Sequence, residues 1–245
     1  MDEAKMTQRM GYDRSITMFS PDGRLLQVEY AKKTVRQGST ALGIQCKDGV
    51  VLVADKRIVG KLVVPESVDK VFQIDDHIAA TAAGIISDAR VLVERAQVKA
   101  QQHRVSYDSG IDVLSVVKEM SDLCQFTTQS AGLRPFGVSL LVAGVDVDHE
   151  PRLFMTDPTG IFFRYRAAVI GEGEVEIEKV LQQKYKTTMT VEEGVQLGVR
   201  ALMDIIGAEL TPDRLEVVVI TVKDKVYTRL SSDKLRDLLA KARKQ

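Results

Sequence analysis

The sequence has few of the residues that cross-link a fold or bind a metal. Its two cysteines, Cys46 and Cys124, lie inside apolar segments without CxxC spacing, so we interpret them as core residues of a protein in a reducing compartment. Its three histidines are scattered without ligand spacing. The segment Gly171–Gly173 lacks most of a phosphate-loop fingerprint, and we interpret it as a turn between a strand and a helix. We therefore expect neither a metal site nor a cofactor.

The sequence also lacks an excess of charge of either sign. Its 245 residues include 34 Lys and Arg and 34 Asp and Glu, so the formal net charge is zero. A general binder of nucleic acid or of membrane surfaces would need a basic excess, so we expect neither partner. No apolar run approaches the roughly 20 residues of a membrane span, and residues 1–14 lack the apolar segment of a signal peptide. We expect a cytoplasmic protein.

The patterning of apolar residues predicts strands and helices without a linker between domains. The clearest predicted strands are Thr40–Cys46, Val50–Asp55, His77–Ala83, Val138–Val145 and Leu215–Val222, and weaker ones are Val71–Ile74, Arg152–Thr156, Ile161–Tyr165 and Ala168–Ile170. Helical spacing predicts helices at 22–37, 87–102, 111–128, 174–185, 190–210 and 232–242. We expect one domain over residues 13–245, preceded by an N-terminal tail at 1–12.

The strand chemistry limits the architecture. Asp48-Gly49 between two apolar runs predicts a hairpin, and Asp157–Gly160 predicts a turn between two short strands, so neighbouring strands are antiparallel. Yet several strands are continuous apolar runs, which is typical of strands buried on both faces. Two stacked antiparallel sheets, each with a pair of helices on its outer face, satisfy both observations. We therefore predict an α+β fold, a four-layer αββα sandwich with an additional N-terminal helix.

One segment near the N-terminus is unusually specific. Residues 11–31 read GYDRSITMFSPDGRLLQVEYA, and further characteristic segments are Gly38–Gly43, Lys47–Val50, Ala54–Arg57, Gly84 with Asp88–Arg90, Arg134–Ser139 and Asp157–Gly160. In type and order these segments resemble the α subunits of proteasomes, especially those of archaea. The resemblance covers the chain from about Tyr12 to Val222 and implies the N-terminal-nucleophile (Ntn) hydrolase fold, which is the αββα sandwich.

Catalytic relatives in that fold use an N-terminal Thr, whose hydroxyl attacks a peptide carbonyl while its freed amine acts as the base. The resemblance places Ser39 at the position of this nucleophile, and Asp55 and Lys70 at those of the assisting Asp and Lys. Without cleavage after Gly38, residue 39 has no free amine. In addition, the helix at 22–37 matches one with which the family fills the substrate cleft. We expect no catalytic residue in this subunit of a threonine-type endopeptidase complex.

Two other classes of function remain as alternatives. An active Ntn hydrolase would use Ser39 after self-cleavage. A cofactor-binding metabolic enzyme would need a pocket motif, which we do not find in the sequence.

The resemblance also implies a gate. In the family, residues matching Tyr12, Asp13, Pro21 and Tyr30 form a cluster between neighbouring subunits that holds the N-terminal tails in the open state. Chemistry alone would make these residues a turn with two half-buried aromatic side chains. The preceding residues 1–10 are polar and uncapped, so we expect the tail to be mobile and to occlude an axial pore.

A second implied site is a pocket between subunits that docks a regulatory AAA+ ATPase by its C-terminal tail. Lys70 would bind the tail carboxylate, Gly38 would allow close approach of the tail backbone, and Ile85 and Ile86 would supply an apolar lining. Lys32 stands where the family often has Arg, which keeps the charge but loses the bidentate fork. On chemistry alone, Lys70 would be a lysine in a surface ion pair.

The loop of Gln129, Ser130, Ala131 and Gly132 is expected to line the annulus through which substrate enters, with Ser130 where archaeal relatives often carry Tyr. Taken as a whole, the resemblance implies a non-catalytic α subunit that forms a seven-membered ring with copies of itself. This ring would stack on rings of proteasome β subunits and gate the passage of unfolded polypeptide.

Overall fold

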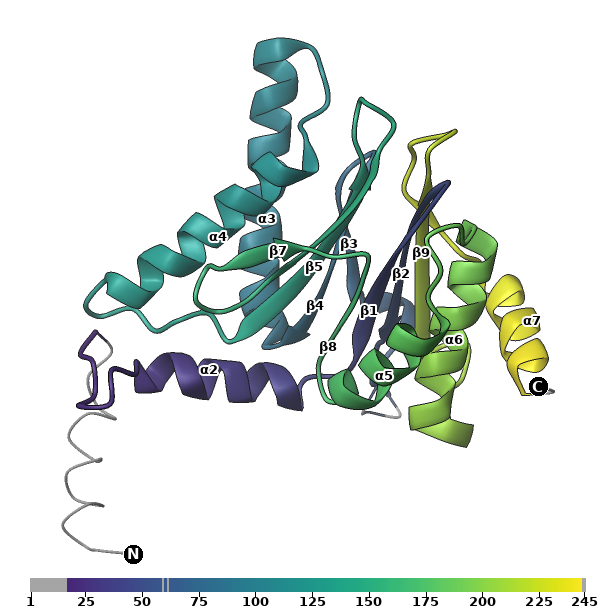
Figure 1. Ribbon diagram of the computed structural model, residues 1–245, viewed down its shortest axis with the longest axis horizontal. Coiled ribbons are helices and arrows are strands. Elements are labelled where there is room, and N and C mark those ends of the chain that lie inside the picture. Colours follow the sequence, from purple (N-terminus) through teal and green to yellow (C-terminus); the bar gives the residue numbers. More distant parts are fainter. Residues whose placement is uncertain (1–16, 59, 61, 244–245) are drawn as a thin grey trace, which may run out of the picture.

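The structure, a computed structural model, describes residues 17–58, 60 and 62–243. Within this part of the chain the strands form two antiparallel sheets of five strands each (Figure 1). The first sheet has the order β10-β9-β2-β1-β8, with β1 at Ala41–Cys46, β2 at Gly49–Asp55, β8 at Ala167–Ile170, β9 at Leu215–Thr221 and β10 at Thr228–Arg229. The second has the order β3-β4-β5-β6-β7, with β3 at Val71–Asp75, β4 at Ile78–Gly84, β5 at Val138–Val145, β6 at Pro151–Thr156 and β7 at Phe162–Arg164. The predicted tail at 1–12 lies outside the described residues.

Helices cover the outer face of each sheet. α3 (Ile86–Tyr107) and α4 (Val113–Gln129) pack on the second sheet, whereas α5 (Glu174–Lys184), α6 (Val191–Ile206) and α7 (Ser232–Ala242) pack on the first. Figure 1 shows the resulting layers from left to right as helices, sheet, sheet and helices. This arrangement confirms the αββα fold predicted from the sequence, with one of the two predicted helix pairs on each sheet.

Three buried apolar layers hold the four structural layers together. Leu52 of β2 and Leu141 of β5 belong to the layer between the two sheets, while Leu42 of β1 packs under α6 and Leu140 of β5 packs under the helices of the other side. Successive side chains of a strand point to opposite faces, so Leu140 and Leu141 enter different layers. All residues of β2 and β5 are buried, which explains why their sequences are almost uninterrupted apolar runs.

Both predicted turns are present. The predicted hairpin is present, but β1 and β2 pair up to Cys46 opposite Gly49, so Lys47-Asp48 is the turn and Gly49 is the first residue of β2. The Asp157–Gly160 turn joins β6 to β7, and its Asp157 carboxylate accepts a hydrogen bond of 2.8 Å from the backbone N–H of Thr159. Gly160 has a φ of +84°, a backbone conformation that residues other than glycine rarely adopt.

Several elements differ from the sequence prediction, and the helix predicted at 87–102 continues as α3 to Tyr107. The N-terminal helix, α2, spans Leu26–Gln37 and begins four residues later than predicted, because Ser20–Arg24 forms a turn in which Gly23 adopts a φ of +74°. The helix predicted to reach residue 210 ends at Ile206, where Gly207 turns the chain into the 3₁₀ helix η2 at Gly207–Glu209. Strand β10 was not predicted, because its two residues are exposed and have no apolar pattern.

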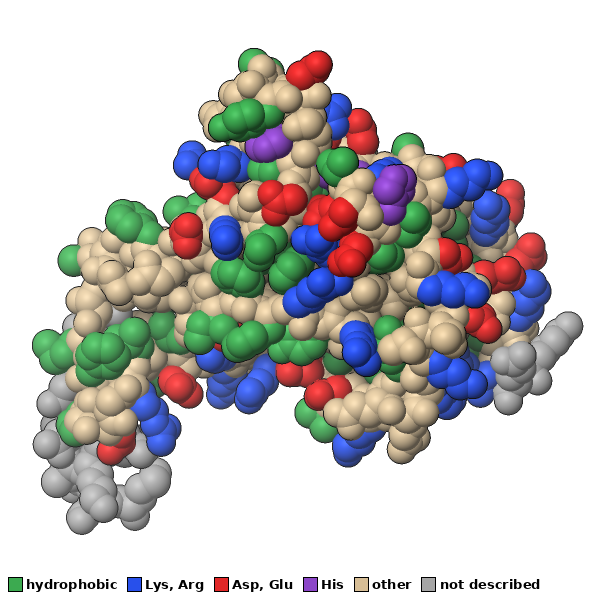
Figure 2. Space-filling model, turned by 45° about the horizontal axis from the view of Figure 1, so that its top comes forward, with side chains coloured by type: hydrophobic (Ala, Val, Ile, Leu, Met, Phe, Trp, Pro, Cys, Tyr) green, Lys and Arg blue, Asp and Glu red, His purple; other side chains and the backbone are tan. Residues whose placement is uncertain are grey.

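Helix α2 lies across the end of the sandwich, beneath β4 and β5 (Figure 1). Its buried face consists of Val28, Ala31 and Val35, and Val35 belongs to the apolar layer between the sheets. The helix is therefore an integral part of the fold. Figure 2 shows acidic and basic side chains intermixed on one face of the molecule, as expected for a chain of zero net charge. In the described part of the chain, no helix is long and apolar enough to span a membrane.

The layer between the sheets should contribute strongly to the stability of the fold. We expect Leu141→Ala, at a side chain with no exposed surface, to lower the free energy of unfolding by about 3 kcal/mol, because it removes buried methyl groups and leaves a cavity. Val147→Ala, at a side chain that is 69% exposed, should change it by less than about 0.5 kcal/mol. Urea titrations of both variants measure the difference, and equal effects would contradict the assignment of Leu141 to a buried core layer.

Candidate functional site

The residues that match the catalytic positions meet where α2 passes into β1. The ammonium of Lys70, which precedes β3, donates a hydrogen bond of 2.8 Å to the carbonyl oxygen of Ser39 and a second, short one to the Ser39 hydroxyl. The structure thus brings together two segments that lie 31 residues apart in the sequence. Because Ser39 is joined to Gly38 by an ordinary peptide bond, the ammonium of Lys70 faces a hydroxyl and a carbonyl, with no free amine at this position.

Lys70 is almost completely buried, with 3% of its surface exposed. Burial lowers the pKa of its ammonium to about 8, partly opposed by the charges of Asp55 and Glu216 and reinforced by that of Arg57. The Glu216 carboxylate accepts hydrogen bonds from the backbone N–H groups of Lys70, at 2.9 Å, and of Val71, at 3.2 Å. These contacts fix the start of β3, so the lysine side chain is directed at Ser39 by a rigid backbone.

Asp55, at the end of β2, is engaged by a different cation. Its two carboxylate oxygens lie 2.5 and 2.7 Å from the guanidinium nitrogens of Arg214, and one of them also accepts a hydrogen bond of 2.9 Å from the backbone N–H of Arg57. The side chain has no exposed surface. The carboxylate that would assist a catalytic lysine is therefore held in a bidentate pair with Arg214. Sequence reasoning missed this role of Arg214, because the two residues are 159 positions apart and no motif links them.

The peptide junction before Ser39 is held on all sides. Gly38 donates its N–H to the carbonyl of Val35 at 3.0 Å, and its own carbonyl accepts a hydrogen bond of 2.9 Å from the N–H of Glu172. A Cβ atom at position 38 would lie 2.2 Å from the backbone nitrogen of Gly84. The close packing of α2 on the end of β4 therefore requires glycine at position 38, independently of any docking partner.

The two isoleucines of the implied pocket lie beside this junction, at the start of α3. Ile85 follows Gly84 directly and donates its backbone N–H to the carbonyl of Gly137 at 2.9 Å. Ile86 lines a groove of about 500 Å³ together with Val68 and Phe72, and also packs against the core under α3. Lys32 is engaged elsewhere, since its ammonium lies 3.0 Å from the carboxylate of Asp157 in the β6–β7 turn.

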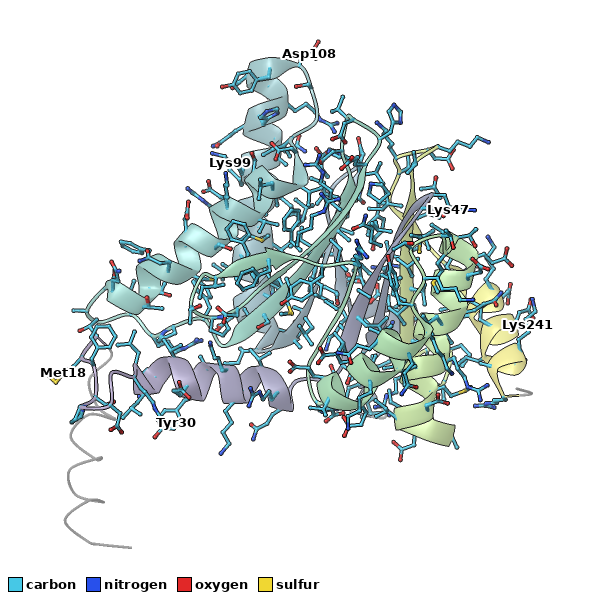
Figure 3. All side chains as sticks on the ribbon, in the orientation of Figure 1. Met18, Tyr30, Lys47, Lys99, Asp108 and Lys241 are labelled. Carbon is cyan, nitrogen blue, oxygen red and sulfur yellow. The ribbon has the colours of Figure 1, made fainter. Side chains whose placement is uncertain are left out.

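Two of the four predicted gate residues can be placed. Pro21 is exposed in the turn that precedes α2, and Tyr30 is 47% exposed on α2 itself (Figure 3). Met18 and Phe19, which precede the turn, are 54% and 64% exposed. Tyr12 and Asp13 lie outside the described residues, so whether the four gather in one cluster stays a prediction.

The predicted annulus loop follows the end of α4. Gln129 is the last residue of the helix, the Ser130 hydroxyl donates a hydrogen bond of 2.9 Å to the carbonyl of Phe126, and Ala131 is exposed. Gly132 has a φ of +87° and turns the chain back. The loop therefore projects from the end of the helix into solvent.

A strong ion pair anchors the segment that follows this loop. The Arg134 guanidinium binds both oxygens of Asp88 in α3, at 2.6 and 2.7 Å, and Asp88 also accepts a hydrogen bond of 2.9 Å from the N–H of Gly137. Burial of the Asp88 carboxyl raises its pKa, but the hydrogen bonds from Arg134 and Gly137 outweigh this effect and the net pKa is lowered. The connection from α4 to β5 is thereby tied to the start of α3.

Comparison with known proteins gives the family of the chain. The family model for proteasome subunits matches residues 35–220, and the model for the N-terminal signature of A-type proteasome subunits matches residues 12–33. This chain belongs to the proteasome subunit family. The relatives include proteins named as alpha subunits of the proteasome from Thermococcus sibiricus, Methanocaldococcus jannaschii and Methanosarcina thermophila.

These relatives are similar over nearly their whole length. The Thermococcus protein is 48% identical over 235 residues, which cover 96% of this chain and 89% of the relative. The Methanocaldococcus protein is 45% identical over 237 residues, covering 97% and 90%, and the Methanosarcina protein is 48% identical over 230 residues, covering 94% and 93%. The family resemblance inferred from residues 11–31 is thus confirmed, and the α-type signature distinguishes this proteasome-family chain from other members of the fold.

The buried lysine of this proteasome-family chain predicts how stability depends on pH. The pKa of Lys70 is about 8 in the folded chain, against an ordinary value of 10.5, so the folded chain binds fewer protons between these two pH values. The free energy of unfolding of the wild type, relative to that of Lys70→Met, should therefore rise as the pH increases from 8 to 10. Below about pH 8 it should be constant. Urea unfolding at a fixed chain concentration measures this, with the exposed Lys47→Met as a control for removing a lysine. A difference that does not vary with pH would contradict the unfavourable burial of the ammonium.

Proposed function

We propose that this chain is a non-catalytic α subunit of a proteasome core, which forms the outer ring and controls the passage of substrate. The observation that carries the proposal is the continuity of α2 with Ser39. The helix buries Val28, Ala31 and Val35 against the ends of the sheets, and its last turn leads through Gly38 into β1. A segment with this much buried surface is part of the folded subunit, whereas a propeptide is removed.

The electrostatics around Ser39 support the same conclusion. A serine nucleophile needs a base that accepts its proton. Here the amine of Ser39 is part of a peptide bond, and the Lys70 ammonium is a donor to Ser39. Asp55 is paired with Arg214. An active hydrolase that uses Ser39 is therefore not favoured, and membership of the α branch of the family agrees with this interpretation.

Mass spectrometry and labelling test this proposal. The purified chain should have the mass of a polypeptide that is intact across residues 38 and 39, and it should not react with an electrophile that labels N-terminal threonine or serine nucleophiles. Ser39→Ala should leave peptide hydrolysis by particles assembled with β subunits unchanged. Mature protein that begins at Ser39 and takes up the label would refute the non-catalytic role.

Membership of the family implies assembly into rings with β subunits. To this we add proposals on ring size, gating and location. The ring has seven copies, and residues 1–12 form its gate, held by Tyr12, Asp13, Pro21 and Tyr30 with the loop of residues 129–132 below it. Unfolded polypeptides pass through this gate, and the particle works in the cytoplasm. These proposals are supported by the match of the α-type signature to residues 12–33.

We further propose that a regulatory AAA+ ATPase docks by its C-terminal carboxylate beside Lys70, Gly38, Ile85 and Ile86. The support is the meeting of a buried cation, a glycine junction and two isoleucines at one end of the sandwich. Lys32, on α2, completes the proposed pocket, and it would have to exchange its partner Asp157 for the tail carboxylate.

Replacement of Lys70 tests the docking site. Lys70→Ala should abolish degradation of unfolded protein that depends on the ATPase, because the tail carboxylate loses its counter-charge, and it should spare hydrolysis of short peptides. Lys47→Ala, at an exposed lysine after β1, serves as the control. Comparing the two activities in assembled particles checks the prediction, and an equal loss of both would assign Lys70 a structural role.

A further inference from the structure

The sandwich has two lateral edges that differ from one another. The strand orders place β7 and β8 at one edge and β3 and β10 at the other, and contacts of β5 with β2 and β8, and of β3 with β9, show that the two sheets are stacked with these edges aligned. In a heterologous ring each copy presents two different faces to its two neighbours. The two lateral edges of this fold provide such a pair of faces.

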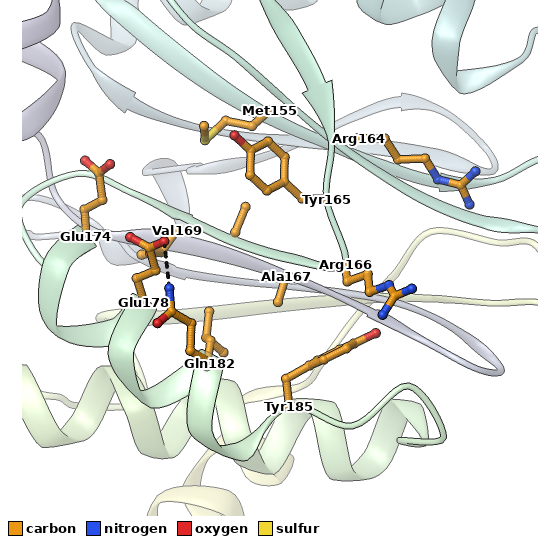
Figure 4. Close-up of a pocket in the computed structure, with 12 residues that line it drawn as sticks. Met155, Arg164, Tyr165, Arg166, Ala167, Val169, Glu174, Glu178, Gln182 and Tyr185 are labelled. Atoms are coloured by element: carbon orange, nitrogen blue, oxygen red, sulfur yellow. Dashed lines mark hydrogen bonds between the residues drawn. The ribbon is translucent and has the colours of Figure 1, made fainter.

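A groove opens at the β7–β8 edge, between α5 and the link from β7 to β8 (Figure 4). It has a volume of about 490 Å³, and we call it the edge groove; its lining includes Met155, Arg164, Tyr165, Arg166, Val169, Glu174, Glu178, Leu181 and Tyr185. Val169 and Leu181 belong to the core under α5 and α6, whereas Met155 packs against the core between the sheets. Two apolar layers thus reach the surface at its floor.

The ends of the edge groove carry opposite charges (Figure 4). Arg164 and Arg166 lie at one end, and Glu174 and Glu178, from the first turns of α5, lie at the other. The Arg166 guanidinium forms no hydrogen bond or ion pair with the residues that the structure describes. A second pocket of about 330 Å³ continues past Arg164, Arg166 and Tyr185. An apolar segment followed by an acidic residue would match the floor and the basic end.

The chain itself has such a segment, which precedes strand β3 at the opposite lateral edge. Leu62 is 99% exposed, Val63 and Val64 are 43% and 60% exposed, and Glu66 follows in the 3₁₀ helix η1 at Pro65–Ser67. We call Leu62–Glu66 the edge segment, and it leads into the edge strand β3. The ammonium of Lys56 donates a hydrogen bond of 2.9 Å to the carbonyl of Pro65, which holds the base of the segment in place.

We propose that the edge segment of one copy docks in the edge groove of the next copy around the ring. The apolar residues of the segment cover the floor, and the Glu66 carboxylate pairs with Arg166. Such exposure of three consecutive apolar side chains is unfavourable in water and is relieved by this contact. The inference depends on the proposed function, because it takes the ring as given and identifies which surfaces of each copy meet.

Charge reversal tests the pairing of Glu66 with Arg166. Glu66→Arg alone and Arg166→Glu alone should each raise the concentration at which rings dissociate by tenfold or more, and the double variant should return it to within threefold of the wild type. Native mass spectrometry over a dilution series measures this concentration. Asp122→Arg, a reversal at an exposed acidic residue in the middle of α4, should leave it unchanged. A double variant no better than either single variant, in a protein whose wild type forms rings, would overturn this inference and leave the proposed function standing.

The apolar part of the contact has its own matched pair of variants. Leu62→Asn should weaken the ring by tenfold or more, whereas Val105→Asn, at a side chain that is 87% exposed on α3, should not. Equal effects of the two substitutions would contradict the apolar docking.

Crosslinking gives a readout that does not depend on affinity. A chain carrying both Leu62→Cys and Gln182→Cys, the latter on the rim of the edge groove, should form a ladder of linked chains after mild oxidation, because each copy joins two neighbours. The native Cys46 and Cys124 are buried, so they do not interfere. Only monomers on the gel would refute the contact. A wild type that forms no ring, either alone or with β subunits, would refute the contact and the proposed function together.

Discussion

The close approach of Gly38 to Gly84 is the constraint on which the site depends. At position 38 there is no room for even one carbon atom beyond the backbone, since it would meet the chain at the end of β4. This packing sets the angle at which α2 enters β1 and holds the following peptide bond against Glu172. The helix, the uncut junction and the position of Ser39 are therefore one structural unit. Removing the helix would expose its apolar face together with part of the layer between the sheets.

The charges around this junction explain how a fold known for catalysis can hold the same residue types without the same chemistry. Lys70 is directed at Ser39, as an assisting lysine would be, but it meets a carbonyl and a hydroxyl of an intact chain. Arg214 occupies both oxygens of Asp55, and among the residues that the structure describes no carboxylate forms a salt bridge with Lys70. Burial then lowers the pKa of the ammonium towards neutrality. The result is a nearly buried cation at the end of the sandwich that donates hydrogen bonds to the intact chain at Ser39.

The sequence predicted the features that depend on neighbouring residues. The β1–β2 hairpin and the strands β2 and β5 followed from turn chemistry and uninterrupted apolar runs, and the αββα layering followed from combining them. The start of α2 was predicted too early, because a glycine with positive φ inside residues 20–24 makes a turn that periodicity does not reveal. Contacts between residues that are distant in the sequence could not be predicted. The pair of Asp55 with Arg214, and the edge groove formed by β6, the β7–β8 link and α5, exist only once the chain is folded.

The presence of two unlike lateral edges also has an evolutionary consequence. In an assembly where a surface meets its own copy, one substitution alters both sides of the contact at once. Here the β7–β8 edge and the β3–β10 edge are encoded by separate parts of the sequence, so each side can change independently. After duplication of the gene, a change on one edge of one subunit and a matching change on the opposite edge of another would make these two subunits neighbours. Such pairs of changes would determine the order of subunits around a ring. A fold of this kind is thus open to diversification into rings of distinct subunits.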